Sequence, residues 1–372
     1  MRILLTGGGT GGHVMPVVAV VKTLNSQLPT PPDYLWVGSY RGLEEKVAAE
    51  NNIPFTSVLT GKLRRYFSLY NIIDIYKIPL GVIQSFFVVR KFKPDVVFSK
   101  GGYVSVPVVI ASWLLRRPII THESDIIPGL ANKIIARLAQ KIAVSFPSTG
   151  QYFDDRKVLV TGNPLRAEIL AGDQARAREK FNLLSDKPVI LVVGGSQGAR
   201  KLNEILVEVL PQLLENYQVL HVCGQDNYQL VQTQVKEVGL KQVGYCLQSF
   251  LSAPAMGDAL ALADLVITRA GINTLNEIAA WGKPALIVPI GSAVLGEHQE
   301  VNAKYFREAG AAVVLPNSEI KAEHLRKEVN DIFSNDSRRQ DLKRKMAKLA
   351  HREAAEKLAD QIIALARGNK HG

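Results

Sequence analysis

The 372-residue chain has only two cysteines, Cys223 and Cys246, and their spacing is not that of metal ligands. So few cysteines exclude a disulfide framework and favour a reducing compartment. No apolar run reaches the roughly 18 to 20 residues that span a bilayer, and no basic-then-apolar leader precedes the first expected strand. Acidic residues are also few, 34 against 45 Lys and Arg, which gives a net charge of +11. We expect a cytoplasmic protein without a transmembrane segment.

The excess of positive charge lies in the first half of the chain. Residues 1–165 carry 19 Lys and Arg against 10 Asp and Glu, whereas residues 166–372 carry 26 against 24. A generally basic protein would spread its excess evenly. The first half is therefore expected to face an anionic partner, either a nucleic acid or a membrane surface.

The stretch 62–93 has the densest positive charge. It holds seven Lys and Arg, one acid and interleaved bulky apolar side chains, which is typical of a segment that contacts an anionic membrane surface. No recognised nucleic-acid-binding motif accompanies it, so we expect no nucleic-acid partner. The alternative is an ordinary core helix that uses Ile83, Phe86 and Phe87 and has a solvated basic face.

The chain opens with a strand, a glycine loop and a helix. Arg2–Thr6 predicts a short buried strand, and the loop Gly7–Gly12 leads into a helix that begins at His13. This layout brings backbone N–H groups and a helix N-terminus up to a phosphate, and glycines permit the close approach. A tight turn with a capping histidine is the structural alternative.

Strands alternate with helices along the rest of the chain, which predicts parallel sheets covered on both faces. Ligands bind at the carboxyl ends of the strands in such sheets. The following residues are therefore expected along one rim: Gly7–His13, Gly101–Tyr103, His122–Asp125 and Asn163.

The opening pattern recurs in the second half. Val189–Val193 predicts a strand, and a second glycine loop follows at 194–198. The sequence Ser99–Gly102 is echoed by Thr268–Gly271, since each reads hydroxyl, cation, small residue, glycine. Two similar nucleotide-binding halves are therefore predicted, with a boundary near Gly162–Pro164. The last stretch, Arg338–Ala366, is expected to be helical and without chemistry.

A group of candidate ligands follows the strand that ends at Thr268. Gly271 allows close approach, and the helix that begins there offers its first amides to a phosphate. Glu277 lies about two turns from Arg269, where a carboxylate can accept both hydroxyls of a ribose. Gln299 offers a donor and an acceptor together, which suits a pair of sugar hydroxyls. A solvated helix acid is the alternative interpretation of Glu277.

The glycines Gly7, Gly9 and Gly12 also satisfy the dinucleotide fingerprint of a dehydrogenase. That fingerprint needs an acid about twenty residues on, at the end of the second strand, to bind the ribose. The second strand here ends at Gly38–Arg41 without an acid. The dehydrogenase interpretation would also leave the loop at 194–198 without a role, so it is disfavoured.

Several motifs together resemble the bacterial UDP-N-acetylglucosamine:lipid I N-acetylglucosaminyltransferases of peptidoglycan synthesis, the MurG family. They are GGGTGGHVMP, KGGYVSVP, HES at 122, GNPLR at 162, GGSQGAR at 194, TRAGINTLNEIAAWGKPALIVP and EHQEVNA. The resemblance implies an α/β protein of GT-B architecture, with two Rossmann-like parallel-sheet domains that face each other across a cleft. It implies an acceptor- and membrane-binding domain over 1–163, a UDP-GlcNAc-binding domain over 164–344, and a C-terminal helix at about 345–372 that packs back on the first domain.

By this resemblance, GlcNAc moves with inversion from UDP-GlcNAc to the MurNAc 4-hydroxyl of lipid I, an undecaprenyl-diphosphate acceptor, at the cytoplasmic face of the bacterial plasma membrane. The donor is expected at Arg166, Ser196, Gln197, Leu251, Arg269, Gly271, Ile272, Asn273, Thr274, Glu277 and Gln299. The loop Thr10, Gly11 and Gly12 is expected to close over the donor, and the rim with Tyr103 and Asp125 to hold the acceptor. Residues 62–93 would contact the membrane.

The reaction needs a base for the acceptor hydroxyl and stabilisation of the departing UDP. His13 is the candidate base, and helix N-termini and loop amides can stabilise the diphosphate. No Asp-x-Asp pair is present, so we expect no metal and no cofactor. The family pattern after His122 and Glu123 is usually Gln-Asn, whereas this chain has Ser124 and Asp125, and Asp125 competes with His13 as base.

A second departure makes Leu251 less secure as the uracil contact, because the segment 250–256 is longer than the family's. Three other functions stay open. They are a related transferase with another lipid acceptor, a UDP-GlcNAc 2-epimerase, which needs no lipid, and a non-catalytic membrane-bound sugar-nucleotide sensor.

Overall fold

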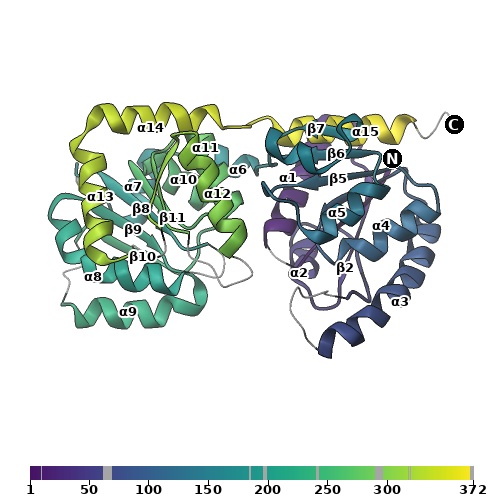
Figure 1. Ribbon diagram of the computed structural model, residues 1–372, viewed down its shortest axis with the longest axis horizontal. Helices are drawn as coiled ribbons and strands as arrows, with labels where there is room; N and C mark the ends of the chain where they lie inside the picture. The colour runs from purple at the N-terminus through teal and green to yellow at the C-terminus, as the bar shows by residue number, and fades with distance from the viewer. Residues whose placement is uncertain are drawn as a thin grey trace. The chain divides into compact units, whose positions relative to one another are not determined.

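The computed structural model describes residues 1–9, 11–61, 69–183, 186–195, 199–239, 243–289, 296–316, 318 and 320–368. The chain forms two compact units (Figure 1). Unit 1 comprises Met1–Arg166 and His351–Gly372, and unit 2 comprises Ala167–Ala350. The chain therefore passes from one unit to the other twice, after Arg166 and after Ala350.

Unit 1 contains a parallel seven-stranded sheet of order β3-β2-β1-β4-β5-β6-β7. Its strands are β1 (Arg2–Gly7), β2 (Asp33–Ser39), β3 (Phe55–Val58), β4 (Val96–Gly101), β5 (Ile119–Glu123), β6 (Lys141–Val144) and β7 (Val158–Val160). Its helices are α1 (Gly11–Gln27), α2 (Leu43–Glu50), α3 (Leu69–Phe92), α4 (Ser105–Leu114), α5 (Leu130–Leu138), the 3₁₀ turns η1 (Pro147–Tyr152) and η2 (Asp155–Lys157), and α15 (Ala354–Gly368).

Unit 2 contains a parallel six-stranded sheet of order β10-β9-β8-β11-β12-β13. Its strands are β8 (Val189–Val193), β9 (Gln218–Val222), β10 (Tyr245–Gln248), β11 (Leu265–Thr268), β12 (Ala285–Ile287) and β13 (Ala312–Val314). Its helices are α6 (Ala167–Leu170), α7 (Gln174–Phe181), α8 (Arg200–Asn216), η3 (Gln225–Asn227), α9 (Tyr228–Glu237), α10 (Ala253–Leu262), α11 (Ile272–Trp281), α12 (Gly296–Glu308), α13 (Ala322–Ser334) and α14 (Asp336–Lys348).

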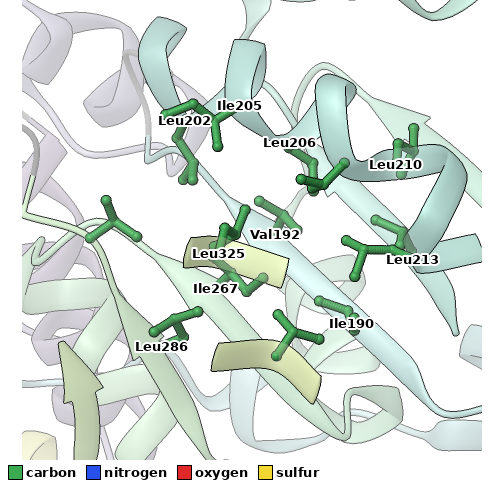
Figure 2. Close-up of a cluster of buried hydrophobic side chains, with 14 of the residues drawn as sticks. Ile190, Val192, Leu202, Ile205, Leu206, Leu210, Leu213, Ile267, Leu286 and Leu325 are labelled. Carbon is green, nitrogen blue, oxygen red and sulfur yellow. The ribbon is translucent and has the colours of Figure 1, made fainter. Parts of the chain in front are cut away.

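The central strands are mainly apolar, as expected for parallel sheets whose two faces are both covered. In unit 1, Ile3 and Leu5 point to a cluster with α1 and α15, whereas Leu4 between them points to a cluster with α4 and α5. In unit 2, side chains of α8 are directed at those of β8, β11 and β12 (Figure 2). Each such fully buried Leu or Ile side chain stabilises the fold by about 1.5–3 kcal/mol.

The structure confirms the predicted strands at both glycine loops and the two parallel sheets. The last stretch is helical as expected, and it is divided into two helices. α14 ends at Lys348 in unit 2 and α15 begins at Ala354 in unit 1, where it packs against α1. The helix breaks because the chain returns to unit 1 there.

Helix α3 carries the described part of the basic stretch, while residues 62–68 lie outside the described residues. Its buried positions include Gly81, Ser85 and Val89, one every four residues. Ile83 and Phe87 are 55% and 64% exposed. The core-helix alternative is therefore wrong for Ile83 and Phe87, whereas Phe86 is half-buried; α3 packs inward through smaller residues. Among the described residues, no helix has the length and apolar character to cross a membrane.

Candidate functional site

The central strands of unit 1 end side by side in glycine turns. β1 and β4 are neighbours, and Gly7 pairs with Gly101. The helices that follow these strands, α1 and α4, cover opposite faces of the sheet. A parallel sheet opens a crevice where successive connections leave to opposite faces in this way, and ligands bind there. The carboxyl ends of β1, β4 and β5 therefore bring His13, Tyr103 and Asp125 to one edge.

The hollow of the first glycine loop contains a protein carboxylate. Glu44, in the first turn of α2, is fully buried and accepts hydrogen bonds from Ser39 N at 2.8 Å, Ser39 Oγ at 2.5 Å and Gly9 N at 3.3 Å. A Cβ on Gly8 would lie 2.5 Å from the Glu44 carboxyl carbon. The glycines thus make room for Glu44, and its negative charge disfavours a phosphate on the Gly9 amide.

His13 lies in the first turn of α1, which begins at Gly11 together with Gly12. Its ring faces Gly102, where a Cβ would lie 3.6 Å from the ring carbons Cγ and Cδ2. Withdrawal from water, and then the charge of Lys100, lower the pKa of the His13 imidazole to about 3. His13 is therefore a neutral imidazole at neutral pH, which can accept a proton.

Tyr103 lies against the same loop from the β4 side. A Cβ on Gly9 would lie 2.9 Å from Tyr103 Cε1, and Gly9 has a φ of +87°. Asn132 of α5 holds the β4 turn, since its Oδ1 accepts the Gly102 N–H at 3.3 Å. Glu44 and Asn132 thus each accept a backbone N–H from one of the two glycine turns of unit 1.

The turn after β5 is built on Glu123. Its carboxylate accepts from Asp125 N at 2.9 Å, Gly129 N at 3.2 Å and Asn132 Nδ2 at 2.8 Å. Burial, and then the charge of Asp125, raise the pKa of the Glu123 carboxyl. Glu123 is thus buried and bound by three N–H groups, whereas Asp125 beside it is half-buried.

His122, also on β5, faces the boundary of unit 1. Its Nε2 donates to the Gly162 carbonyl at 2.8 Å, so its Nδ1 carries no proton. Burial, followed by Lys100, keeps the pKa of His122 well below its usual value. Asn163, the residue after Gly162, is buried, and Arg166 three residues further on is half-buried.

The pattern that Ser99–Gly102 and Thr268–Gly271 share lies at equivalent positions of the two sheets. In unit 1, a Cβ on Gly7 would lie 2.9 Å from the Lys100 Cβ. In unit 2, a Cβ on Gly195 would lie 3.2 Å from the Arg269 Nη2. The cation at the carboxyl end of the fourth strand of each unit thus packs against the glycine loop after its first strand.

Arg269 is the half-buried cation of the unit 2 edge. Burial lowers its pKa, and its Nε has no hydrogen-bond partner within the described part of the chain. α11 begins beside it, with Gly271 as N-cap and Ile272, Asn273 and Thr274 in its first turn. A guanidinium and a helix N-terminus together suit an anionic ligand.

α12 brings Gln299 to the same edge. Asn302 Nδ2 donates to the Ala270 carbonyl at 3.1 Å, which ties α12 to the turn after β11. Gln299 lies one turn earlier on the same face of α12. Its buried Oε1 has no partner among the residues that the structure describes. Glu277 is half-buried on α11, one turn beyond Asn273.

Leu251 lies further along the sheet. It is buried after β10, and β9 and β8 separate that strand from β11. At about 4.8 Å per strand, Leu251 lies about 14 Å along the sheet from the Arg269 strand. The sheet therefore does not bring Leu251 into contact with Arg269. The expected ligands Thr10, Ser196 and Gln197 lie outside the described residues.

Sequence reasoning missed Glu44, Asn132 and Asn302. Glu44 was missed because it lies beyond the end of β2, on a helix from which it reaches back to the loop. The asparagines carry no spacing signal of their own. Among the described residues, no group of three or more His, Cys, Asp or Glu could hold a metal ion.

Two parallel sheets with the same central strand order, each with a glycine loop at the carboxyl edge, define the GT-B class of glycosyltransferase fold. The glycosyltransferase family 28 N-terminal domain matches residues 3–144, and the glycosyltransferase family 28 C-terminal domain matches residues 189–362. The chain belongs to glycosyltransferase family 28.

Similar proteins cover nearly the whole chain. The UDP-N-acetylglucosamine–N-acetylmuramyl-(pentapeptide) pyrophosphoryl-undecaprenol N-acetylglucosamine transferase 2 of Bacillus anthracis is 41% identical over 334 residues, which are 90% of this chain and 92% of the relative. The transferase of the same description (without the final numeral) from Legionella pneumophila strain Paris is 39% identical over 370 residues, 99% of this chain and 97% of the relative.

Solved structures show the same architecture. The crystal structure of Acinetobacter baumannii MurG has a TM-score of 0.75 and 29% identity, and the match covers 98% of this chain and 99% of that one. A UDP-GlcNAc 2-epimerase from Neisseria meningitidis has a TM-score of 0.70 at 12% identity, covering 98% of this chain and all of that one, and this likeness concerns the fold alone.

Proposed function

We propose that this glycosyltransferase moves GlcNAc from UDP-GlcNAc to the MurNAc 4-hydroxyl of lipid I, with inversion, and so forms lipid II in peptidoglycan synthesis. The observation that carries the proposal is the match to transferases of that description at 39–41% identity over 90–99% of the chain. Both family 28 domains are present in order, which supports the proposal.

The donor is assigned to unit 2. The Arg269 guanidinium has an Nε without a partner in the described structure, and the diphosphate of UDP-GlcNAc supplies the acceptor that it needs. The first amides of α11, from Gly271 to Thr274, add a positive helix terminus that stabilises the charge on the departing UDP. Glu277 is assigned to the ribose hydroxyls.

Gln299 is assigned to the GlcNAc hydroxyls, because its buried Oε1 has no partner among the described residues and accepts a hydroxyl proton. Ser196 and Gln197, in the loop after Gly195, and the main chain at Leu251 complete the donor assignment. Arg166 is assigned to the donor by family resemblance only.

The acceptor is assigned to unit 1. Tyr103 and the amides of Gly11 and Gly12 lie around one edge, and the diphosphate of lipid I suits the α1 N-terminus there. Thr10, Gly11 and Gly12, which the family resemblance expects to close over the donor, are thus assigned here to the acceptor diphosphate. Glu44 neutralises the Gly9 end of that loop, which directs an anion toward the α1 end.

The base for the MurNAc hydroxyl is assigned to His13, with Asp125 as its competitor. His13 is neutral at neutral pH and therefore ready to take a proton, although its low pKa makes it a weak base. Asp125 is a half-buried carboxylate at the same edge. His13→Ala and Asp125→Asn are compared for kcat, with UDP-GlcNAc affinity as the control. The base is the residue whose loss lowers kcat and leaves that affinity unchanged.

Membrane contact is assigned to α3. Tyr76, Leu80, Ile83 and Phe87 are exposed and recur at helical spacing on one face, and Arg90 and Lys91 follow in the last turn. Each cation near an anionic leaflet contributes on the order of 1 kcal/mol. We infer a peripheral position on the cytoplasmic face of the plasma membrane.

Binding to phosphatidylglycerol vesicles tests the membrane assignment. The double variant Ile83→Glu, Phe87→Glu is expected to lose sedimentation with these vesicles, because it removes apolar area and adds negative charge. Leu230→Glu, at an exposed apolar position on α9, is the matched control and should bind as the unmodified protein does. Equal binding by all three proteins contradicts the assignment.

Product analysis tests the function itself. The purified protein is incubated with UDP-GlcNAc and lipid I, or with diacylglycerol in place of lipid I. We expect UDP release and a disaccharide product with lipid I only. Transfer to diacylglycerol identifies a different lipid-directed transferase, and UDP-GlcNAc binding without any transfer identifies a sensor.

A further inference from the structure

The edge of unit 1 contains a cation that the proposed chemistry does not use. Lys100, the penultimate residue of β4, has no exposed surface, although its side chain carries an ammonium group. Lysine is almost never fully buried unless its charge is compensated. Its stem packs against Gly7, at the start of the first glycine loop. A fully buried lysine at this position therefore requires an explanation.

The contacts of Lys100 point to the turn after β5. Its Nζ donates to Ser124 Oγ at 2.9 Å, and Ser124 is itself buried between Glu123 and Asp125. Burial lowers the pKa of the Lys100 ammonium group, and the charges of Glu123 and Asp125 work against that shift by favouring the ammonium form. The charged groups that act with Lys100 at this edge are His13 on α1, His122 and Glu123 on β5, and Asp125 after it.

The position of Asp125 explains why a cation is needed there. A half-buried carboxylate at an acceptor edge repels the diphosphate of an incoming acceptor. A buried cation bonded to the neighbouring Ser124 offsets that repulsion and fixes the turn that carries Asp125. Because Lys100 has no exposed surface, it exerts this effect through the turn and not by touching the acceptor.

We propose that Lys100 is a positioning residue for the acceptor: its buried ammonium group anchors Ser124 and balances the carboxylates of Glu123 and Asp125, so that an anionic acceptor can bind beside Asp125. This inference rests on the assignment of the acceptor diphosphate to unit 1. It assigns to the pair Lys100 and Asp125 a shared role in acceptor affinity.

A double-mutant cycle on acceptor binding tests the coupling. Dissociation constants are measured for lipid I in detergent micelles without UDP-GlcNAc, for the unmodified protein, Lys100→Gln, Asp125→Asn and the double variant. Lys100→Gln keeps an N–H donor for Ser124 and removes the charge. We expect Lys100→Gln to weaken binding about tenfold, the scale of a coupling of about 1.4 kcal/mol. In the Asp125→Asn background, the same change should weaken binding by less than about threefold.

A second variant, Lys100→Met, removes both the hydrogen-bond donor for Ser124 and the charge. As a control, the dissociation constant for UDP-GlcNAc reports whether unit 2 is intact in each variant. The proposed charge balance is refuted if the Lys100→Gln variant binds lipid I as tightly as the unmodified protein. It is also refuted if Lys100→Gln weakens lipid I binding equally with and without Asp125→Asn. If Lys100→Gln does not fold, Ser124→Ala replaces it in the cycle with the same criterion. Failure of the unmodified protein to bind lipid I instead overturns the proposed function, which separates the two failures.

Discussion

Glu44 is expected to hold the first glycine loop in place, and Glu44→Ala is the change that tests this. The change leaves Ser39 N and Gly9 N without their acceptor, together with the Ser39 hydroxyl. A buried donor without a partner costs about 1–3 kcal/mol, and removal of a buried side chain adds a cavity. We therefore expect a loss of about 3–5 kcal/mol in the unfolding free energy of unit 1.

Urea unfolding, combined with hydrogen exchange of the loop amides, measures that loss and locates it. Glu45→Ala is the matched control, because Glu45 is the next residue of α2, is exposed and accepts the Arg41 N–H at 3.1 Å. The control should lose less than about 0.5 kcal/mol. An equally small loss for both variants, with unchanged exchange at Gly9, would refute the role of Glu44.

Three further predictions concern other parts of the chain. Arg176→Met should lower the urea midpoint at neutral pH and much less in acid, because Arg176 lowers the pKa of the buried Asp258 carboxyl. The stabilisation by this ion pair is lost as the pH falls through the lowered pKa, below the unfolded value of about 3.9, so urea midpoints at several pH values measure it. Gly162→Ala should cost about 2 kcal/mol or more, because its φ is +85° and a Cβ would overlap His351, and thermal unfolding reports this. The kcat/KM profile should show no loss from protonation of His13 until the pH approaches about 3, and a limb near its ordinary value of about 6.5 would contradict the burial argument.

The local sequence pattern predicted the strands, the glycine loops that follow them and the parallel sheets. The apolar runs before Gly7 and Gly194 are strands, and the strand order places their loops at the carboxyl edge, where ligands bind in such sheets. The echo of Ser99–Gly102 in Thr268–Gly271 also predicted equivalent positions in the two sheets, where each cation packs on a glycine loop.

Tertiary contacts decided what the pattern left open. Glu44 binds a loop 35 residues earlier, and no spacing rule connects the two. In the sequence, Lys100 counted only as one of the positive charges of the first half, whereas in the structure its side chain is fully buried and bonded to Ser124. On α3, the composition suited both a core helix and a surface helix, and the small residues that pack inward decided between them.

A crystal structure of the protein soaked with UDP-GlcNAc tests the central claim most directly, that the two similar glycine loops have different roles. We predict the diphosphate beside Arg269 and the first turn of α11, with the ribose at Glu277 and the sugar at Gln299. Nucleotide bound instead at the Gly7–Gly9 loop, with Glu44 displaced, would contradict the assignment of the donor to unit 2 and of the acceptor to unit 1.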